Sequence, residues 1–116
     1  MRVGLICNTG FTPGTALRRY LTQHGLHDHF AAMHFSCETG FAKPHRRAFT
    51  DTLKALGVTP AETIHIGDNP ATDVAGAKRV GMRAALLHRA ATPPPPGHGA
   101  DVVVATLGEF AAYLGH

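Results

Sequence analysis

Short apolar runs alternate with amphipathic stretches along most of this 116-residue chain. The apolar runs predict five strands, at residues 3–7, 33–36, 62–66, 82–87 and 101–105. The amphipathic stretches predict four helices, at residues 13–24, 44–56, 70–80 and 107–114. Strands that alternate with helices through short loops indicate a parallel sheet with right-handed crossovers.

Turn-forming residues mark the ends of these elements. Thr12 is placed to cap the first helix, with Pro13 in its first turn. Gly57 is placed to end the helix at residues 44–56. Residues 37–40 are expected to form a loop. Four consecutive prolines exclude a helix or a strand ladder at residues 90–99, which are expected to form an extended loop.

Length and composition are those of one small globular domain spanning residues 1–116. Apolar residues make up 44% of the chain, enough to bury a core. No run approaches the roughly 20 apolar residues that cross a bilayer, and the apolar run at the start is too short for a secretory signal. We therefore expect a cytoplasmic protein in which Cys7 and Cys37 are reduced.

The chain is mildly basic, with a net charge of +3 and a pI near 9.2. Its basic residues are scattered, and the densest cluster is only Lys43, His45, Arg46 and Arg47. Aromatic residues are sparse and tryptophan is absent. A basic excess of this kind is typical of a solvated surface, so we expect neither a nucleic-acid nor a membrane partner.

Candidate chemistry lies where the third strand ends. Gly67 permits a tight turn, and Asp68 then lies at the carboxyl end of the strand, where open α/β sheets place their ligands. Asp73 follows in the next helix. Two carboxylates suit Mg²⁺, which takes one or two of them together with phosphate and water. The alternative is that Asp68 caps the helix and Asp73 is surface charge.

Two other segments follow earlier strands. Asn8 and Thr9 come directly after the first strand and offer hydrogen-bonding side chains and backbone amides. Lys43 precedes Pro44 at an expected helix start, where a cation beside free amides favours an anion. Taken alone, this lysine is more typical of an exposed surface. Together with the acidic pair, however, the three segments suit a phosphoryl group.

These segments resemble, in order, three motifs of the haloacid dehalogenase-like (HAD) hydrolases, in their phosphatase-type branch. Residues 5–10 resemble the second motif, residues 40–44 the third, and residues 67–73 the fourth, acidic motif. Residues 74–82 fit the family's usual continuation, and the resemblance covers most of the chain. Dinucleotide binding is disfavoured because no Gly-x-Gly-x-x-Gly occurs.

The resemblance implies an α/β fold with a three-layer, Rossmann-like core around a parallel sheet. It also implies a magnesium-dependent phosphatase that acts on a small phosphorylated metabolite. Asp68 would ligate Mg²⁺ with support from Asp73. Lys43 would be catalytic and neutralise the phosphoryl group, and Asn8 and Thr9 would join it in contacting phosphate oxygens.

The family's first motif, Asp-x-Asp, is absent from the chain. In the family this motif supplies the nucleophile and the general acid and base, so we expect the chain alone to be inactive and to hold Mg²⁺ weakly. The strand that carries it lies between the strands at residues 3–7 and 62–66, which leaves the sheet incomplete; the cap is expected to be missing too. The flanking strands could pair directly, or another chain or a dimer partner could supply a strand. The outcome we favour is that the sequence is the C-terminal part of a longer, truncated protein.

Cys7 stands where the family has Ser or Thr, and a thiol is a weak hydrogen-bond donor. A catalytic Cys7 is disfavoured because no histidine stands at a recognisable spacing from it. A non-catalytic binding or regulatory HAD-like domain is therefore the alternative function. The nine histidines share no metal-ligand spacing, and His65, within a strand, is expected to be packed or hydrogen-bonded.

Overall fold

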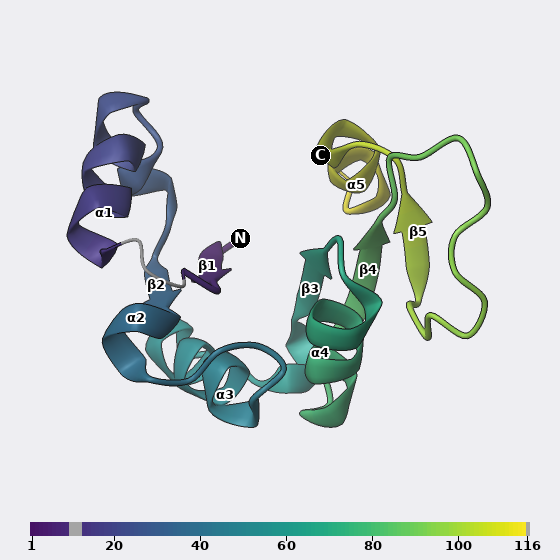
Figure 1. The fold of residues 1–116 in the computed structure, drawn as a ribbon, viewed down its shortest axis with the longest axis horizontal. Coiled ribbons are helices and arrows are strands. Elements are labelled where there is room, and N and C mark those ends of the chain that lie inside the picture. Colours follow the sequence, from purple (N-terminus) through teal and green to yellow (C-terminus); the bar gives the residue numbers. More distant parts are fainter. Residues whose placement is uncertain (10–12, 116) are drawn as a thin grey trace. The chain divides into compact units, whose positions relative to one another are not determined.

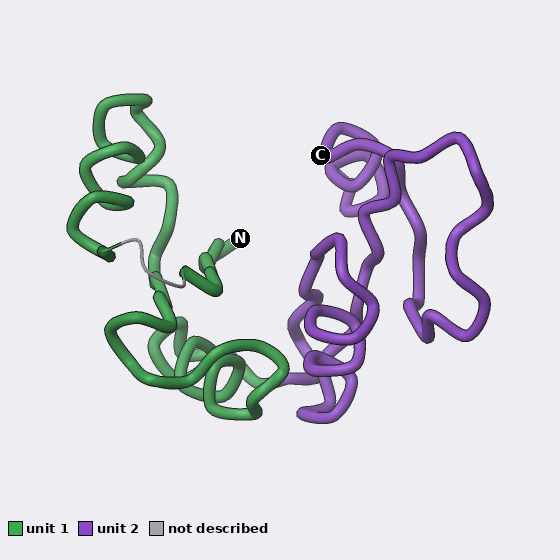
Figure 2. The backbone as a smooth tube through the Cα atoms, viewed as in Figure 1, with its two compact units in different colours: residues 1–59 green, residues 60–116 purple. Residues whose placement is uncertain are grey.

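A computed structural model describes residues 1–9 and 13–115 of the chain. These residues cluster into two compact units, residues 1–59 and residues 60–116 (Figure 2). Along the chain the elements are β1 (Gly4–Cys7), α1 (Gly14–Gln23), η1 (His27–His29), β2 (Ala32–Phe35), α2 (Ser36–Thr39), α3 (Arg46–Leu56), η2 (Pro60–Glu62), β3 (Ile64–Gly67), η3 (Pro70–Val74), α4 (Ala75–Arg79), β4 (Arg83–Leu87), β5 (Val102–Val104) and α5 (Leu107–Tyr113) (Figure 1).

In the first unit, α3 packs on a parallel pair of strands, β1 and β2. Phe49, Leu53 and Leu56 of α3 are buried, as their helical spacing predicts. A Cβ at Gly4 would lie 3.1 Å from Leu56 Cδ1, so the absence of a side chain there lets β1 approach the helix closely. The helix ends at Gly57, whose φ of 70° is the left-handed conformation expected of a C-terminal cap.

In the second unit, three parallel strands form a sheet in the order β3-β4-β5. The central strand β4 contributes Ala84, Ala85 and Leu86 to the core. Val74 and Ala77 lie on the segment that follows β3, and both are buried. The helix expected at residues 70–80 is present, but it begins as a π-helix (η3) before it continues as α4. Such turns are rare and often accompany functional sites.

The predicted strands and long helices are all present, with ends that differ by a few residues. One expectation is wrong: residues 37–40 are not a loop, because Ser36–Thr39 form the short helix α2. The Gly40 N–H donates to the Ser36 carbonyl (2.9 Å) and closes this turn. Four residues are too few to display a helical period in the sequence. Thr12, the expected cap of α1, lies outside the described residues.

The α/β fold with parallel strands is confirmed, and the described strands form two sheets. Within its own unit, β1 pairs only with β2, and β3 pairs only with β4 among the described strands. Both strands are half-buried throughout, whereas three of the five residues of β4 are buried. Parallel strands are normally buried on both faces, so the half-buried state of β1 and β3 is unusual.

The expectation of a single domain stays a prediction. Among the described residues, no helix combines the length and the apolar character needed to cross a membrane.

Candidate functional site

The two aspartates of the second unit lie in opposite environments. Asp68 is exposed directly after β3 and makes no hydrogen bond or ion pair with the described residues. Asp73 is only 3% exposed. Its Oδ2 accepts from the Asn69 N–H (3.1 Å), and its Oδ1 lies 3.0 Å from His65 Nε2. Asp73 is therefore a structural carboxylate of the turn, and the alternative that it is surface charge is wrong.

Asn69, not Asp68, caps the helical segment that follows. Its side-chain oxygen accepts from the backbone N–H groups of Ala71 (2.9 Å) and Thr72 (3.3 Å). Pro70 occupies the first turn, where its missing N–H leaves no donor unsatisfied. The alternative that Asp68 caps the helix is therefore wrong, because its neighbour Asn69 fills that role. The exposed Asp68 carboxylate takes no part in capping.

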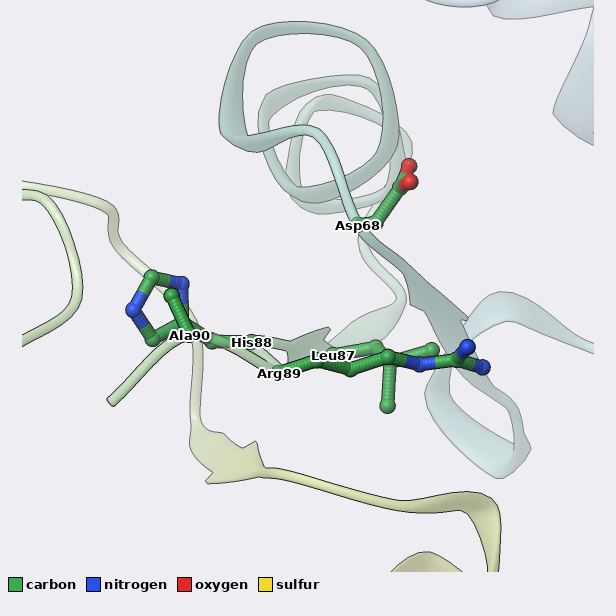
Figure 3. A pocket seen from close by; sticks show the side chains of 5 residues that line it. All are labelled: Asp68, Leu87, His88, Arg89 and Ala90. Atoms are coloured by element: carbon green, nitrogen blue, oxygen red, sulfur yellow. The ribbon is translucent and has the colours of Figure 1, made fainter. Parts of the chain in front are cut away.

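A pocket of about 400 Å³ lies beside Asp68 and is lined otherwise by residues 87–90, at the end of β4 (Figure 3). The His88 N–H donates to the Val104 carbonyl (2.8 Å), and the His88 ring contacts the Thr92 carbonyl (2.9 Å). Arg89 is exposed and has no hydrogen-bond or ion-pair partner among the described residues. In Figure 3 its guanidinium and the His88 ring extend to opposite sides.

Sequence reasoning missed His88 and Arg89 as lining residues. The available signal was their position directly after a predicted parallel strand, because ligands bind beyond the carboxyl ends of such strands. Neighbouring parallel strands end at the same edge, so the residues after β4 fall beside the residue after β3.

In the first unit, Asn8 brackets the backbone of Lys43. The Lys43 N–H donates to Asn8 Oδ1 (2.8 Å), and Asn8 Nδ2 donates to the Lys43 carbonyl (3.1 Å). Both polar groups of this exposed side chain are thereby used to fix a residue 35 positions away. The half-buried Lys43 is consequently held at the end of β1 by a paired contact.

Thr9 ties the same strand end to α2. Its N–H donates to Ser36 Oγ (2.9 Å), and its Oγ1 accepts from the Cys37 N–H (3.0 Å). The structure thus brings Asn8, Thr9 and Lys43 together in the first unit. Their contacts with phosphate stay predictions, because the observed contacts are within the chain.

Cys7 ends β1 as a half-buried free thiol, and Cys37 is free and exposed. Burial raises the pKa of the Cys7 thiol, and the nearby Lys43 charge lowers it by less. A raised pKa leaves less thiolate at neutral pH, which is the opposite of what an activated nucleophile requires. A catalytic Cys7 therefore stays disfavoured.

The donor set of the second unit can be compared with the needs of a magnesium ion. Asp68 offers a carboxylate without a described partner, which suits an ion that takes few protein ligands together with phosphate and water. Both Asp73 oxygens are engaged within the chain, which fits a supporting role. Across residues 1–9 and 13–115, no three His, Cys, Asp or Glu side chains gather as a metal site. Asp68 fits as one ligand among several.

Comparisons with known proteins place the chain in a family. The family model described as haloacid dehalogenase-like hydrolase matches residues 1–81. The chain is 40% identical over 92 residues to a phosphoserine phosphatase of Thermus thermophilus, covering 79% of the chain and 37% of that protein. It is 31% identical over 109 residues to a glyceraldehyde 3-phosphate phosphatase of Methanothermobacter thermautotrophicus, covering 89% of the chain and 46% of that protein.

A solved structure, the HAD phosphatase from Thermococcus onnurineus, matches with a TM-score of 0.84 and 32% identity, covering 98% of the chain and 50% of that structure. The chain therefore belongs to the haloacid dehalogenase-like hydrolases, and its similarities lie with the phosphatases among them. It spans half or less of the length of these three proteins.

Proposed function

We propose that this chain is part of the core of a magnesium-dependent phosphatase that acts on a small phosphorylated metabolite. The observation that carries the proposal is the Asp68 carboxylate, which is exposed at the carboxyl end of β3 beside a pocket and has no described partner. Membership of the family and the phosphatase activity named for two relatives support the reaction class.

The proposed roles follow from the environment of each side chain. Asp68 would ligate the metal, and Asp73 would hold the turn that presents it. Magnesium, when bound, would stabilise negative charge on the phosphoryl oxygens. Lys43, whose backbone is held by Asn8, would neutralise charge on the phosphoryl group. Phosphate contacts from Asn8 and Thr9 would add to their observed roles in fixing this loop and α2.

The chain alone is proposed to be inactive, because none of the residues at 1–9 and 13–115 is placed as the nucleophile. The remaining aspartates serve other elements. Asp28 lies in η1, Asp51 lies in α3 beside Arg47, and Asp101 is bound by Lys78. Covalent phosphoryl transfer requires a positioned nucleophile, which the family resemblance assigns to an Asp-x-Asp motif.

Metal binding tests the proposal directly in this chain. Mn²⁺, a paramagnetic ion that favours similar oxygen ligands, should selectively broaden the amide signals of residues 67–73 in an NMR titration. Asp68→Asn should abolish this broadening, whereas Asp28→Asn, a control at an exposed carboxylate, should leave it unchanged. Broadening that is absent from the wild type, or that survives Asp68→Asn, would overturn the assignment of Asp68.

A second candidate is a non-catalytic binding or regulatory domain. The specific observation in its favour is Cys7, a weak donor with a raised pKa at a position where the family has Ser or Thr. In-frame translation of the DNA upstream of Met1 separates the two. An apolar strand ending in Asp-x-Asp favours the enzyme, and a stop codon close upstream favours the binding domain.

We also propose that an additional strand, from another chain or a dimer partner, completes a sheet at β1 or β3. In support, each strand is half-buried and pairs on one side only within the described residues, and main-chain hydrogen bonds readily recruit a strand to such an edge. Light scattering across a concentration series tests for a dimer: a constant monomer mass would contradict self-association.

A cytoplasmic location is proposed as well, supported by the two free thiols.

A further inference from the structure

The contacts of Asp73 point to a role for a residue outside the recognised motifs. A buried carboxylate is unfavourable unless hydrogen bonds compensate for its lost hydration. Asp73 has such contacts on both oxygens, one with His65 and one with the Asn69 N–H. Across the described residues, no buried side-chain nitrogen or oxygen lacks a partner. The site is therefore fully satisfied with both contacts in place.

The Asp73 side chain lies directly against the backbone of Gly67. A Cβ added at Gly67 would fall far inside van der Waals contact with the Asp73 carboxyl carbon. Asp73 thus touches the residue before Asp68 and accepts a hydrogen bond from the residue after it. This arrangement brackets the backbone of Asp68 while leaving its carboxylate exposed.

His65 contacts the other carboxylate oxygen of Asp73, Oδ1. It lies two residues before Gly67 on β3, and alternate strand residues face the same side. Its side chain is 12% exposed, and that of Asp73 is 4% exposed. With Asp73 ionised its oxygens can only accept, so the contact then requires the proton on His65 Nε2. The contact therefore fixes both the ring and the carboxylate in a nearly dry environment.

We infer that His65 is a positioning residue of the metal site: through Asp73 it holds the turn from Gly67 to Asn69 that presents Asp68. This inference rests on the proposed metal-binding role of Asp68. It assigns no contact between His65 and the metal. Residues that orient metal ligands in this indirect way typically change metal affinity by about 10- to 100-fold when they are replaced.

The test measures the Mn²⁺ dissociation constant of the full chain from the broadening of the amide signals of residues 67–73. His65→Gln carries an amide nitrogen at about the reach of Nε2 and should stay within about threefold of the wild type. His65→Asn is too short to reach Asp73, and His65→Leu has no donor. Both should weaken binding about tenfold or more.

His34→Leu is the matched control, because His34 is another largely enclosed histidine, and its Nε2 contacts the Phe41 carbonyl (2.8 Å) in the other unit. It should leave Mn²⁺ affinity unchanged, which separates positioning from a general loss of stability. If His65→Leu does not fold, the comparison of Asn with Gln retains the test.

The possible failures are distinguishable. Equal affinity in the wild type and in every folded His65 variant overturns the positioning role and leaves Asp68 as the ligand. If His65→Gln weakens Mn²⁺ binding as much as His65→Asn does, the positioning role is also overturned, because a side chain that restores the donor would then have no effect. A wild type without Asp68-dependent broadening instead overturns the proposed function, and this inference with it.

Discussion

At the scale of single residues, two aspartates five positions apart have divided roles. The sequence offers the same side chain twice, but the fold exposes Asp68 and buries Asp73. The difference arises because Asp73 lies on the buried side of the π-helix η3, where its carboxylate contacts His65 and the Asn69 N–H. The Asp68 carboxylate is exposed without a described partner, and the Asp73 carboxylate holds the turn.

Stability measurements should separate these roles. Asp73→Asn replaces one acceptor oxygen with a donor group and leaves a buried contact unmatched, which typically costs about 1–3 kcal/mol. Asp68→Asn removes a charge from an exposed side chain without a described partner and should change the free energy of unfolding by less than about 0.5 kcal/mol. Urea denaturation of both variants provides the measurement. Equal losses would contradict the division of roles.

The thiol of Cys7 should react slowly. Because burial raises its pKa, the thiolate fraction at neutral pH is smaller than for an ordinary cysteine. Iodoacetamide labelling followed by mass spectrometry should modify the exposed Cys37 well before Cys7, and the Cys7 rate should rise with pH. Lys43→Gln removes the charge that lowers the pKa of Cys7 and should slow its labelling further, whereas Lys54→Gln should not. Faster labelling of Cys7 than of Cys37 would contradict this environment.

At the scale of elements, the proline-rich loop is anchored at its C-terminal end. Asp101 Oδ2 accepts from the Ala84 N–H (2.8 Å), and Lys78 Nζ lies 2.9 Å from Asp101 Oδ1. The Asp101 N–H in turn donates to the Ala84 carbonyl (2.8 Å). Side-chain and main-chain contacts thus close residues 88–101 onto β4 ahead of β5.

The pH dependence of stability should report this anchor. The hydrogen bond from Ala84, and then that from Lys78, lower the pKa of Asp101 below its ordinary value of 3.8. A lowered folded-state pKa stabilises the protein above the ordinary value, and this contribution is lost as the pH falls through the folded-state pKa. Asp101→Asn should therefore lower the melting temperature at neutral pH, and its deficit should shrink as the pH falls below 3.8. The control Asp28→Asn should show no comparable trend.

Apolar periodicity and turn residues predict most elements but not their local departures. Helix α3 is predictable because its buried face requires apolar residues at helical spacing, namely Phe49, Leu53 and Leu56, and its left-handed end favours glycine, namely Gly57. The short helix α2 has no such pattern in the sequence, and the Cys37 N–H in its first turn donates to Thr9, which lies far away along the chain. The π-turn of η3 is hidden as well, because apolar spacing predicts a helix without specifying its hydrogen-bond pattern.

The sequence predicts where the candidate site residues lie along the chain, but not which contacts each of them makes. The position of Asp68 after a strand and the packing of His65 within one follow from the order of elements. The bracket formed by Asn8 around Lys43, and the burial of Asp73, depend on contacts that the sequence pattern does not contain. His88 and Arg89 were missed because the loop after β4 carries none of the motifs.

At the scale of the whole molecule, the described strands supply two sheets, each with an edge strand that is only half-buried. The metal-ligand candidate Asp68 follows one of these edge strands, and Asn8 and Thr9 follow the other. Strands β1 and β3, each paired on one side only among the described strands, therefore lead directly into the segments that carry these candidate residues. Family membership supplies the reason to connect the two facts, since the motif absent from this chain is the one that the resemblance places on an intervening strand.

The decisive functional prediction concerns turnover. With Mg²⁺ and p-nitrophenyl phosphate, the chain should show no hydrolysis above the buffer rate, because Lys43 and Asp68 can bind charge but neither is a nucleophile that forms a phosphoryl intermediate. A trace of activity is informative only with its control: hydrolysis that persists in Asp68→Ala would come from a contaminant. Hydrolysis abolished by Asp68→Ala would contradict the prediction and require a nucleophile within these 116 residues. Cys7→Ala would then be the first variant to assay, since Cys7 ends β1 and carries a thiol at the carboxyl end of that strand.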